Sequence, residues 1–240
     1  ELGLYLSPWD RNNPTWGTPQ YNNYFIATLW ELIAPDLNDY GSPFEVWFDH
    51  GHDRTIVTEE QLATYDGTLW IHEVRRRIPG AIIAPEVDAF YPGNEAGVAP
   101  ETNWSVRTDF HRWAPFECSV TLRAERSWFW HPQDDPKSLE DLVDIYFTSV
   151  GRGCTLLLAV APDTRGLLEE EDVDRLYEWR NALDKIFSDN LAFQRETTAS
   201  STRPGSRGWA AGAAVDGDEE SFWVAEEETG WIEVDLGRPL

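Results

Sequence analysis

Two carboxylates stand where a catalytic site on a parallel sheet would place them. The apolar run Phe44–Asp49 ends in an aspartate, with Trp47 two residues earlier and therefore on the same strand face. Functional side chains collect at the carboxyl ends of parallel strands and in the loops after them. A carboxylate beside an aromatic ring is what a glycosidase nucleophile needs. From its position alone, Asp49 is equally well interpreted as a helix N-cap or a solvated loop residue.

A second acidic candidate, Glu95, lies in the loop Gly93–Gly97. Glycines on either side allow a turn that other residues resist, so the backbone can hold this carboxyl group in place. Glycoside hydrolysis commonly uses two carboxyl groups, and Glu95 could be the general acid. A solvated loop acid is an equally good interpretation, because the chain has 43 acidic residues. The sequence gives the order of Asp49 and Glu95 but not their distance.

Tryptophan is unusually frequent, with 13 residues in 240. Aromatic faces stack on the C–H faces of sugars, although any single tryptophan is also good core filler. Several of them fall in polar or turn-rich contexts: Trp9, Trp16, Trp104, Trp113, Trp128 and Trp130. Together they favour a carbohydrate-binding surface.

Other kinds of chemistry are less well supported. The pair His50 and His52 could suggest a metal, but no third ligand is in sight, so we interpret both as loop residues and expect no metal ion and no cofactor. Phosphate-binding loops, Gly-x-Ser-x-Gly elbows and catalytic cysteine contexts are absent from the sequence. Cys118 and Cys154 lie in strand-like surroundings, and we interpret them as buried thiols.

Over the first 190 residues, short β-branched or aromatic runs alternate with helical periods. This pattern predicts an α/β fold with a parallel sheet. The expected strands are Leu2–Ser7, Phe44–Asp49, Ala81–Pro85, Glu117–Arg123 and Thr155–Pro162. The expected helices are Tyr21–Ala34, Glu59–Arg77 with a break near Asp66, Leu139–Val150 capped by Ser138, and Glu170–Phe187.

The composition changes after Asn190. A small polar stretch, Thr197–Ser206, has no helical period, and Ile232–Leu236 alternates with period two. This alternation predicts a half-buried strand of an antiparallel sheet. We therefore expect two domains, residues 1–190 and a truncated β-sandwich over residues 191–240.

Composition excludes some partners. Acidic residues outnumber basic ones 43 to 19, for a formal charge of −24, which repels a phosphate backbone, so nucleic acid is not expected. The longest apolar run, Leu156–Ala161, is too short for membrane insertion. Only Lys137 and Lys185 are lysine, which is typical of a salt-adapted surface, and high-GC codon bias explains it equally simply.

Several linked motifs give the chain a specific resemblance. They occur in consistent order over about residues 2–190: Gly3–Asn12, Phe44–Asp49, Gly93–Gly97, Glu101–Trp104, Glu117–Cys118, Trp128–Pro132, and Leu156–Leu158 followed by Ala161–Asp163 and Arg165–Gly166. In this the chain resembles the α-L-fucosidases of glycoside hydrolase family 29, in particular the subfamily that acts on α-1,3- and α-1,4-linked fucose.

The resemblance implies a retaining hydrolase on a (β/α)8-like TIM barrel that releases terminal fucose from oligosaccharides or glycans. It implies that Asp49 is the nucleophile and Glu95 the acid/base. Trp47 and Trp128 are the implied pocket wall, with Tyr5, Trp9 and Asp10 as further lining residues. A barrel of this kind that has lost activity and serves as a lectin, and a retaining exo-glycosidase for a related sugar such as galactose, are the alternatives.

Members of the family carry earlier strands with fucose-binding histidines upstream of Leu2. The chain lacks methionine and begins at Glu1, so we expect an incomplete barrel, inactive and poorly soluble by itself. His50 stands where glycine is usual. The tail from about Ala199 resembles the start of a discoidin (factor V/VIII type C) module, on Ala213–Asp218 and Trp231–Gly237. Glycan substrates and such a module favour an extracellular or periplasmic protein, and any signal peptide would lie upstream.

Overall fold

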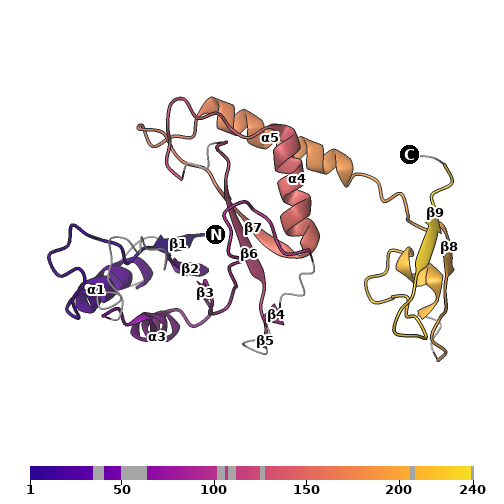
Figure 1. Ribbon diagram of the computed structural model, residues 1–240, viewed down its shortest axis with the longest axis horizontal. Coiled ribbons are helices and arrows are strands. Elements are labelled where there is room, and N and C mark those ends of the chain that lie inside the picture. Colours follow the sequence, from indigo (N-terminus) through magenta and orange to yellow (C-terminus); the bar gives the residue numbers. More distant parts are fainter. Residues whose placement is uncertain are drawn as a thin grey trace. The chain divides into compact units, whose positions relative to one another are not determined.

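The structure is a computed structural model that describes residues 1–34, 41–49, 64–101, 106–107, 112–124, 128–205 and 209–238 (Figure 1). The chain divides into two compact units, Glu1–Leu176 and Tyr177–Leu240. This division falls inside helix α5 (Glu170–Ile186), whereas the sequence places a domain boundary after residue 190. The domain assignment 1–190 and 191–240 stays a prediction.

Parallel strands form the framework of the first unit, as the βαβ pattern predicts. Within the described ranges, β1 (Gly3–Leu6), β2 (Glu45–Phe48) and β3 (Ile82–Ala84) make one parallel sheet in that order. A second parallel pair consists of β6 (Phe116–Thr121) and β7 (Cys154–Ala159). An isolated parallel bridge from Phe90 to Phe116 leads from the segment after β3 to β6. The antiparallel strands β4 (Val106–Arg107) and β5 (Arg112–Trp113) were not expected.

The helices begin and end close to their expected bounds, and side-chain caps fix where two of them begin. They are α1 (Tyr21–Ile33), α3 (Gly67–Arg77), α4 (Leu139–Ser149) and α5, with short 3-10 turns at Val150–Arg152 and Ala211–Ala214. Asp66 caps α3 by accepting a hydrogen bond from the Leu69 amide at 2.9 Å. Ser138 and Asp141 form a reciprocal capping box on α4. The expected helical segment before Asp66 lies largely outside the described residues.

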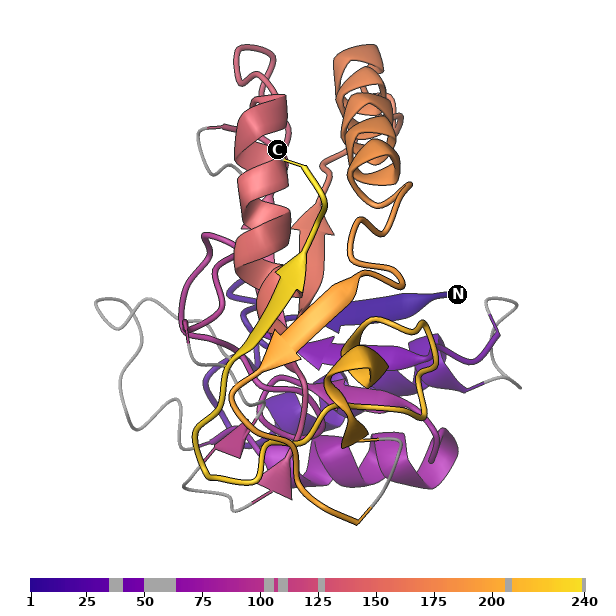
Figure 2. The same ribbon diagram turned by 90° about the vertical axis from the view of Figure 1, so that its right-hand side faces the viewer.

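The apolar core lies between β1–β3 and the two helices on one side of this sheet, α1 and α3 (Figures 1 and 2). Val46 and Phe48 of β2 point into this core, together with Leu29 of α1 and Trp70 of α3. Successive residues of a strand point to opposite faces, so Glu45, Trp47 and then Asp49 occupy the other face. The hydrophobic pattern of β2 thereby decides which side chains are left for chemistry.

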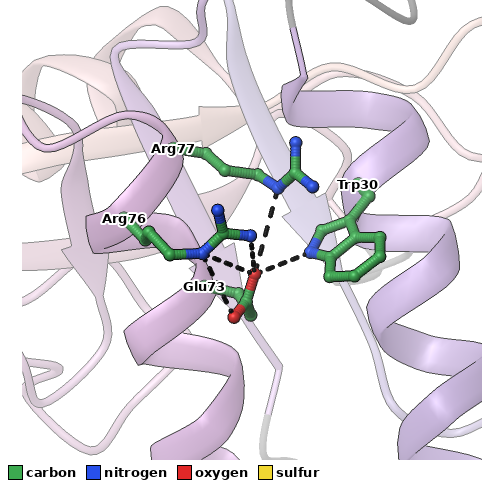
Figure 3. A network of polar contacts seen from close by, with 4 residues as sticks. All are labelled: Trp30, Glu73, Arg76 and Arg77. Atoms are coloured by element: carbon green, nitrogen blue, oxygen red, sulfur yellow. Dashed lines mark hydrogen bonds and ion pairs between the residues drawn. The ribbon is translucent and has the colours of Figure 1, made fainter.

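A polar network fastens α1 to α3 beside this core (Figure 3). Glu73 is 8% exposed. Its carboxylate accepts a hydrogen bond from Trp30 Nε1 at 2.9 Å and forms an ion pair with Arg76 at 2.6 Å. The guanidinium of Arg77 lies 4.5 Å from the centre of the Trp30 ring. Arg77 Nε also lies 3.9 Å from Glu73 Oε2, so Arg77 contacts both the carboxylate and the indole between the helices.

The interpretation of the two cysteines as thiols is wrong. Cys118 on β6 and Cys154 on β7 form a disulfide, with their Cα atoms 6.2 Å apart. The parallel register pairs Cys118 with Leu156 and Cys154 with Phe116, so the bond runs diagonally between neighbouring strands. Cysteines 36 positions apart reveal such a pairing only when the strand register is known.

The second unit contains an antiparallel pair, β8 (Glu196–Ala199) and β9 (Ile232–Asp235). The strand expected over Ile232–Leu236 is confirmed, and it alternates between half-buried and exposed residues. Its partner β8 overlaps the beginning of the small polar stretch Thr197–Ser206, for which the sequence indicated no helical period and no strand was expected. In the part of the chain that the structure describes, no helix has the length and apolar character to span a bilayer.

Candidate active site

Asp49 is fixed at the end of β2 by two contacts to β1. Its amide donates to the Leu6 carbonyl at 2.9 Å and continues the sheet ladder beyond Phe48. Its carboxylate oxygen Oδ2 accepts a hydrogen bond from the Tyr5 hydroxyl. Burial, this hydrogen bond and the negative charge of Asp49 raise the pKa of Tyr5. The phenol therefore stays protonated and remains a donor to the carboxylate at neutral pH.

Aromatic rings surround this carboxylate on the same sheet face. Tyr5 and Trp47 occupy paired positions on β1 and β2, and their rings stack with centroids 5.7 Å apart and planes within 17°. Tyr91, in the loop after β3, meets Trp47 edge to face at 6.5 Å. The result is a wall of three rings, two of which carry hydroxyl groups. Such a wall offers both stacking and hydrogen bonds to a sugar ring.

The loop that carries Glu95 is shaped by its glycines and by Asn94. Gly93 and Gly97 have φ values of +83° and +69°, so the expectation that glycine permits this turn is confirmed. The Asn94 side chain donates to the Val98 carbonyl at 2.8 Å and accepts from the Ala96 amide at 3.1 Å. This local network leaves Glu95 exposed at the tip of the turn.

The structure brings the two candidate carboxylates to the same group of tyrosines. Trp128 Nε1 donates to Glu95 Oε2 at 3.3 Å. The charges of Asp49 and Glu95 both act on Tyr5 and both act on Tyr91, raising the pKa of each phenol in addition to its burial. The two acids, 46 positions apart in the sequence, thus face one common aromatic surface.

A second carboxyl pair lies below this surface. Glu45 and Glu117 are 9% and 7% exposed, and Glu45 lies close enough to Glu117 to act on the pKa of its carboxyl group. Trp47 Nε1 donates to Glu117 Oε2 at 3.0 Å. Burial, followed by the hydrogen bond and charge of Glu45, raises the pKa of Glu117 to about 8. At neutral pH the pair therefore retains a proton.

Trp9 and Asp10 lie in the loop after β1. The Trp9 ring packs against Trp16 at 6.0 Å, and Asp10 Oδ1 accepts from the Asn12 amide at 3.2 Å. Asp10 also lies near Tyr21, whose pKa is raised by burial and then by this charge. Their role in lining a pocket stays a prediction. His50 and His52 lie outside the described residues, among which no group of metal-ligating side chains occurs.

Tyr91, Glu45 and Glu117 were not expected to have a role in the site. Glu45 could have been found from the strand period, because it alternates with Trp47 and Asp49 on one face. Glu117 belongs to the Glu117–Cys118 motif of the resemblance. Its contact to Trp47 spans 70 positions, however, and depends on how β2 and β6 are arranged. Tyr91 is visible only once the loop after β3 is folded.

One carboxylate at the end of a parallel strand and a second in a later loop, both near aromatic rings, are the arrangement expected of a carbohydrate-active hydrolase. A family model described as alpha-L-fucosidase matches residues 1–185. The chain belongs to this family of glycoside hydrolases.

Known proteins agree with this assignment. The chain is 33% identical to alpha-L-fucosidase 1 of Arabidopsis thaliana in an alignment of 255 positions, which covers 96% of this chain and 48% of that protein. It superimposes on the crystal structure of SpGH29 with a TM-score of 0.82, 30% identity and coverage of 98% of this chain and 56% of that one. For the Ruminococcus gnavus GH29 fucosidase in complex with fucose, the TM-score is 0.79, with 27% identity and coverage of 98% and 56%.

These structural neighbours are GH29 fucosidases, whose catalytic domain is TIM-barrel-like, which agrees with the expected fold class. The chain spans about half the length of the curated relatives that it matches.

Proposed function

We propose that the protein containing this chain is a retaining α-L-fucosidase, with Asp49 as nucleophile and Glu95 as acid/base. Beyond family membership, one observation carries the proposal: Tyr5 donates a hydrogen bond to Asp49 and also lies close enough to Glu95 for the charge of Glu95 to raise the pKa of the phenol. A double displacement at one sugar carbon requires two carboxyl groups around a single ring.

In the first step, a carboxylate oxygen of Asp49 attacks the anomeric carbon of fucose. The bond from this carbon to the glycosidic oxygen breaks, and the oxygen takes the proton of Glu95 as it leaves. The product is a fucosyl ester of Asp49. Tyr5 orients the attacking carboxylate through its hydrogen bond, and Trp128 fixes Glu95 Oε2.

In the second step, the Glu95 carboxylate removes a proton from water. The water oxygen attacks the anomeric carbon, the ester bond to Asp49 breaks, and fucose leaves with its original configuration. The same two side chains are regenerated in their starting protonation states.

We further propose that the substrates are glycans with terminal α-1,3- or α-1,4-linked fucose, as the motif resemblance implies. The fucose complex of the Ruminococcus gnavus relative supports fucose as the sugar. For the second unit we propose the start of a discoidin-like module. The β8–β9 pair and Trp223, whose Nε1 donates to the Ser201 carbonyl at 3.0 Å, support a small β-rich unit.

An extracellular or periplasmic location is the proposal that best suits the disulfide between Cys118 and Cys154. Disulfides form and persist mainly in oxidising compartments. Fractionation of cells that express the natural protein, with thiol labelling of each fraction, tests this location.

The decisive experiment uses the natural protein that contains this chain, assayed on an aryl α-L-fucoside. Asp49→Gly should lower kcat by at least about 1,000-fold, because the variant lacks the carboxylate that forms the ester. Added azide should restore turnover of Asp49→Gly and give a fucosyl azide of inverted configuration. Glu95→Ala should lose most activity on substrates with poor leaving groups and least on activated aryl fucosides.

The other outcomes separate the alternatives. Fucose binding without hydrolysis indicates a lectin, and faster hydrolysis of an aryl galactoside indicates a different sugar specificity. Full activity of Asp49→Gly would refute the assigned nucleophile. Oligosaccharides with α-1,3, α-1,4 and α-1,2 fucose, compared at equal concentration, test the linkage preference.

A further inference from the structure

A buried pair of acids lies directly behind the aromatic wall of the proposed active site. Glu45 and Glu117 come from β2 and β6, which are not neighbours in a sheet, since β3 follows β2 and β7 pairs with β6. The two side chains are nevertheless close enough for Glu45 to act on the pKa of Glu117, and each residue is less than a tenth exposed. Two ionised carboxylates in contact and away from water would repel each other strongly.

The contacts of the pair require one proton and connect the pair to Trp47. Glu117 Oε2 already accepts the indole hydrogen of Trp47 at 3.0 Å. The contact between Glu117 and Glu45 requires a proton on one of the two acids, because carboxylates are acceptors only. Trp47 in turn stacks on Tyr5, and Tyr5 donates to Asp49. A chain of contacts thus leads from the carboxyl pair to the proposed nucleophile.

We propose that Glu45 and Glu117 share one proton and that Glu117 is a positioning residue, which holds Trp47 and through it the Tyr5–Asp49 pair. The positioning role rests on the proposed function, whereas the shared proton does not. Loss of the proton would place two charges in contact, separate the acids and free the Trp47 indole.

The surroundings of the pair limit what else could titrate. On β2 and β1, the positions next to the pair are occupied by Trp47 and Gly3, and on β3 by Ile82. On β7, Thr155 stands opposite Glu117. Beyond Trp47 lie Tyr5 and Tyr91, whose rings contact it, and the charges of Asp49 and Glu95 act on both tyrosines. Burial and the charge of Glu45 raise the pKa of Glu117 to about 8, so the proton should leave in mildly alkaline solution.

The test uses three variants of the natural protein that contains this chain. Glu117→Gln keeps a donor for Glu45 and an acceptor for Trp47 but has no proton to lose. Glu117→Leu removes both hydrogen bonds. Glu227→Gln, on an exposed residue of the second unit, is the matched control.

Two readouts need no substrate. At pH 7 the infrared spectrum should contain a protonated carboxyl stretch that disappears in Glu117→Gln and in alkaline solution, and that Glu227→Gln retains. The near-ultraviolet circular dichroism contributed by Trp47, obtained by difference from Trp47→Phe, should change between pH 7 and pH 9. This change should be absent in Glu117→Gln. Absence of the carboxyl stretch would refute the shared proton, and an unchanged circular dichroism would refute the positioning of Trp47. Both conclusions hold whether or not the protein cleaves fucosides.

The kinetic readout uses an activated aryl fucoside, whose leaving group does not need the proton of Glu95. The wild type should lose kcat/KM as the pH rises through about 8, and Glu117→Gln should lose this alkaline limb. Glu117→Leu should lower kcat/KM about 10-fold or more at every pH, because the Trp47 indole and the Glu45 carboxylate are left unpaired. An alkaline limb identical in wild type and Glu117→Gln would refute the positioning role.

Discussion

The Tyr5 hydroxyl donates a hydrogen bond to Oδ2 of Asp49, across 44 positions of sequence and between two neighbouring parallel strands. The tyrosine stacks on Trp47 as well, so a single side chain links the proposed nucleophile to the aromatic wall. Since burial and the Asp49 contact raise the pKa of Tyr5, the donor persists throughout the neutral range.

Tyr5→Phe should therefore reduce kcat/KM by about 10- to 100-fold, because it removes a hydrogen bond to a charged group while the ring still stacks. Steady-state kinetics on an aryl α-L-fucoside measure the loss. Tyr24→Phe, on the exposed face of α1, is the control and should have no effect. Equal activity of Tyr5→Phe and wild type would show that Asp49 is oriented without Tyr5.

Gly97→Ala should destabilise the fold by about 2–4 kcal/mol, because the left-handed backbone and overpacking both oppose a side chain here. An added Cβ would lie 2.9 Å from Val120 Cγ1 and 3.0 Å from Ile145 Cγ2, at a φ of +69°. Val120 and Ile145 are buried and cannot move aside easily. Denaturant unfolding measures the free energy.

Gly93→Ala provides the matched comparison on the other side of Glu95. It has a similar φ of +83° but no atom within 4 Å of an added Cβ, so the backbone cost alone, about 1–2 kcal/mol, should be seen. If both variants lose the same free energy, the close approach to Val120 has no energetic role.

Reduction of the disulfide between Cys118 and Cys154 should lower the free energy of unfolding by about 2–4 kcal/mol. The crosslink restricts the unfolded chain over 36 positions and joins adjacent strands in the folded state. Urea unfolding with and without reductant measures the difference, and mass spectrometry after alkylation counts the thiols. In Cys118→Ala/Cys154→Ala, reductant should have no effect. Two alkylated cysteines in the native, unreduced protein would contradict the pairing.

Glu73→Gln should loosen the contact between α1 and α3 and cost about 1–3 kcal/mol, because Trp30 and Arg76 lose a charged acceptor. The Arg76 contact, followed by the Trp30 hydrogen bond, lowers the pKa of Glu73. A lowered pKa means that this stabilisation is present above the ordinary glutamate range and is lost as the pH falls through the folded-state pKa.

Unfolding measured from neutral to acidic pH tests this sign, since the difference between wild type and Glu73→Gln should shrink in acid. Arg180→Ala breaks the exposed pair with Asp184 on α5 and should leave stability unchanged. A wild-type advantage that grows on acidification would contradict the network.

The type and order of the main elements followed from the sequence, because strand period, helical period and capping residues act over a few neighbours. Ser138 and Asp66 show this, since each accepts from an amide three residues on. The same local rules predicted that Trp47 and Asp49 share one strand face and that glycines form the turn that carries Glu95. The strand Glu196–Ala199 escaped these rules, because its small polar residues have no pattern of their own and its partner β9 fixes it.

Contacts between distant strands were decided only by the tertiary structure. The order and register of the strands pair Cys118 with Cys154, join Tyr5 to Asp49, and bring Glu45 to Glu117 across the position of β3. The physical reason is that a sequence specifies which side chains share a face over a few residues, whereas packing of whole strands determines which faces meet. Candidate acids could therefore be named from the sequence, but their partners could not.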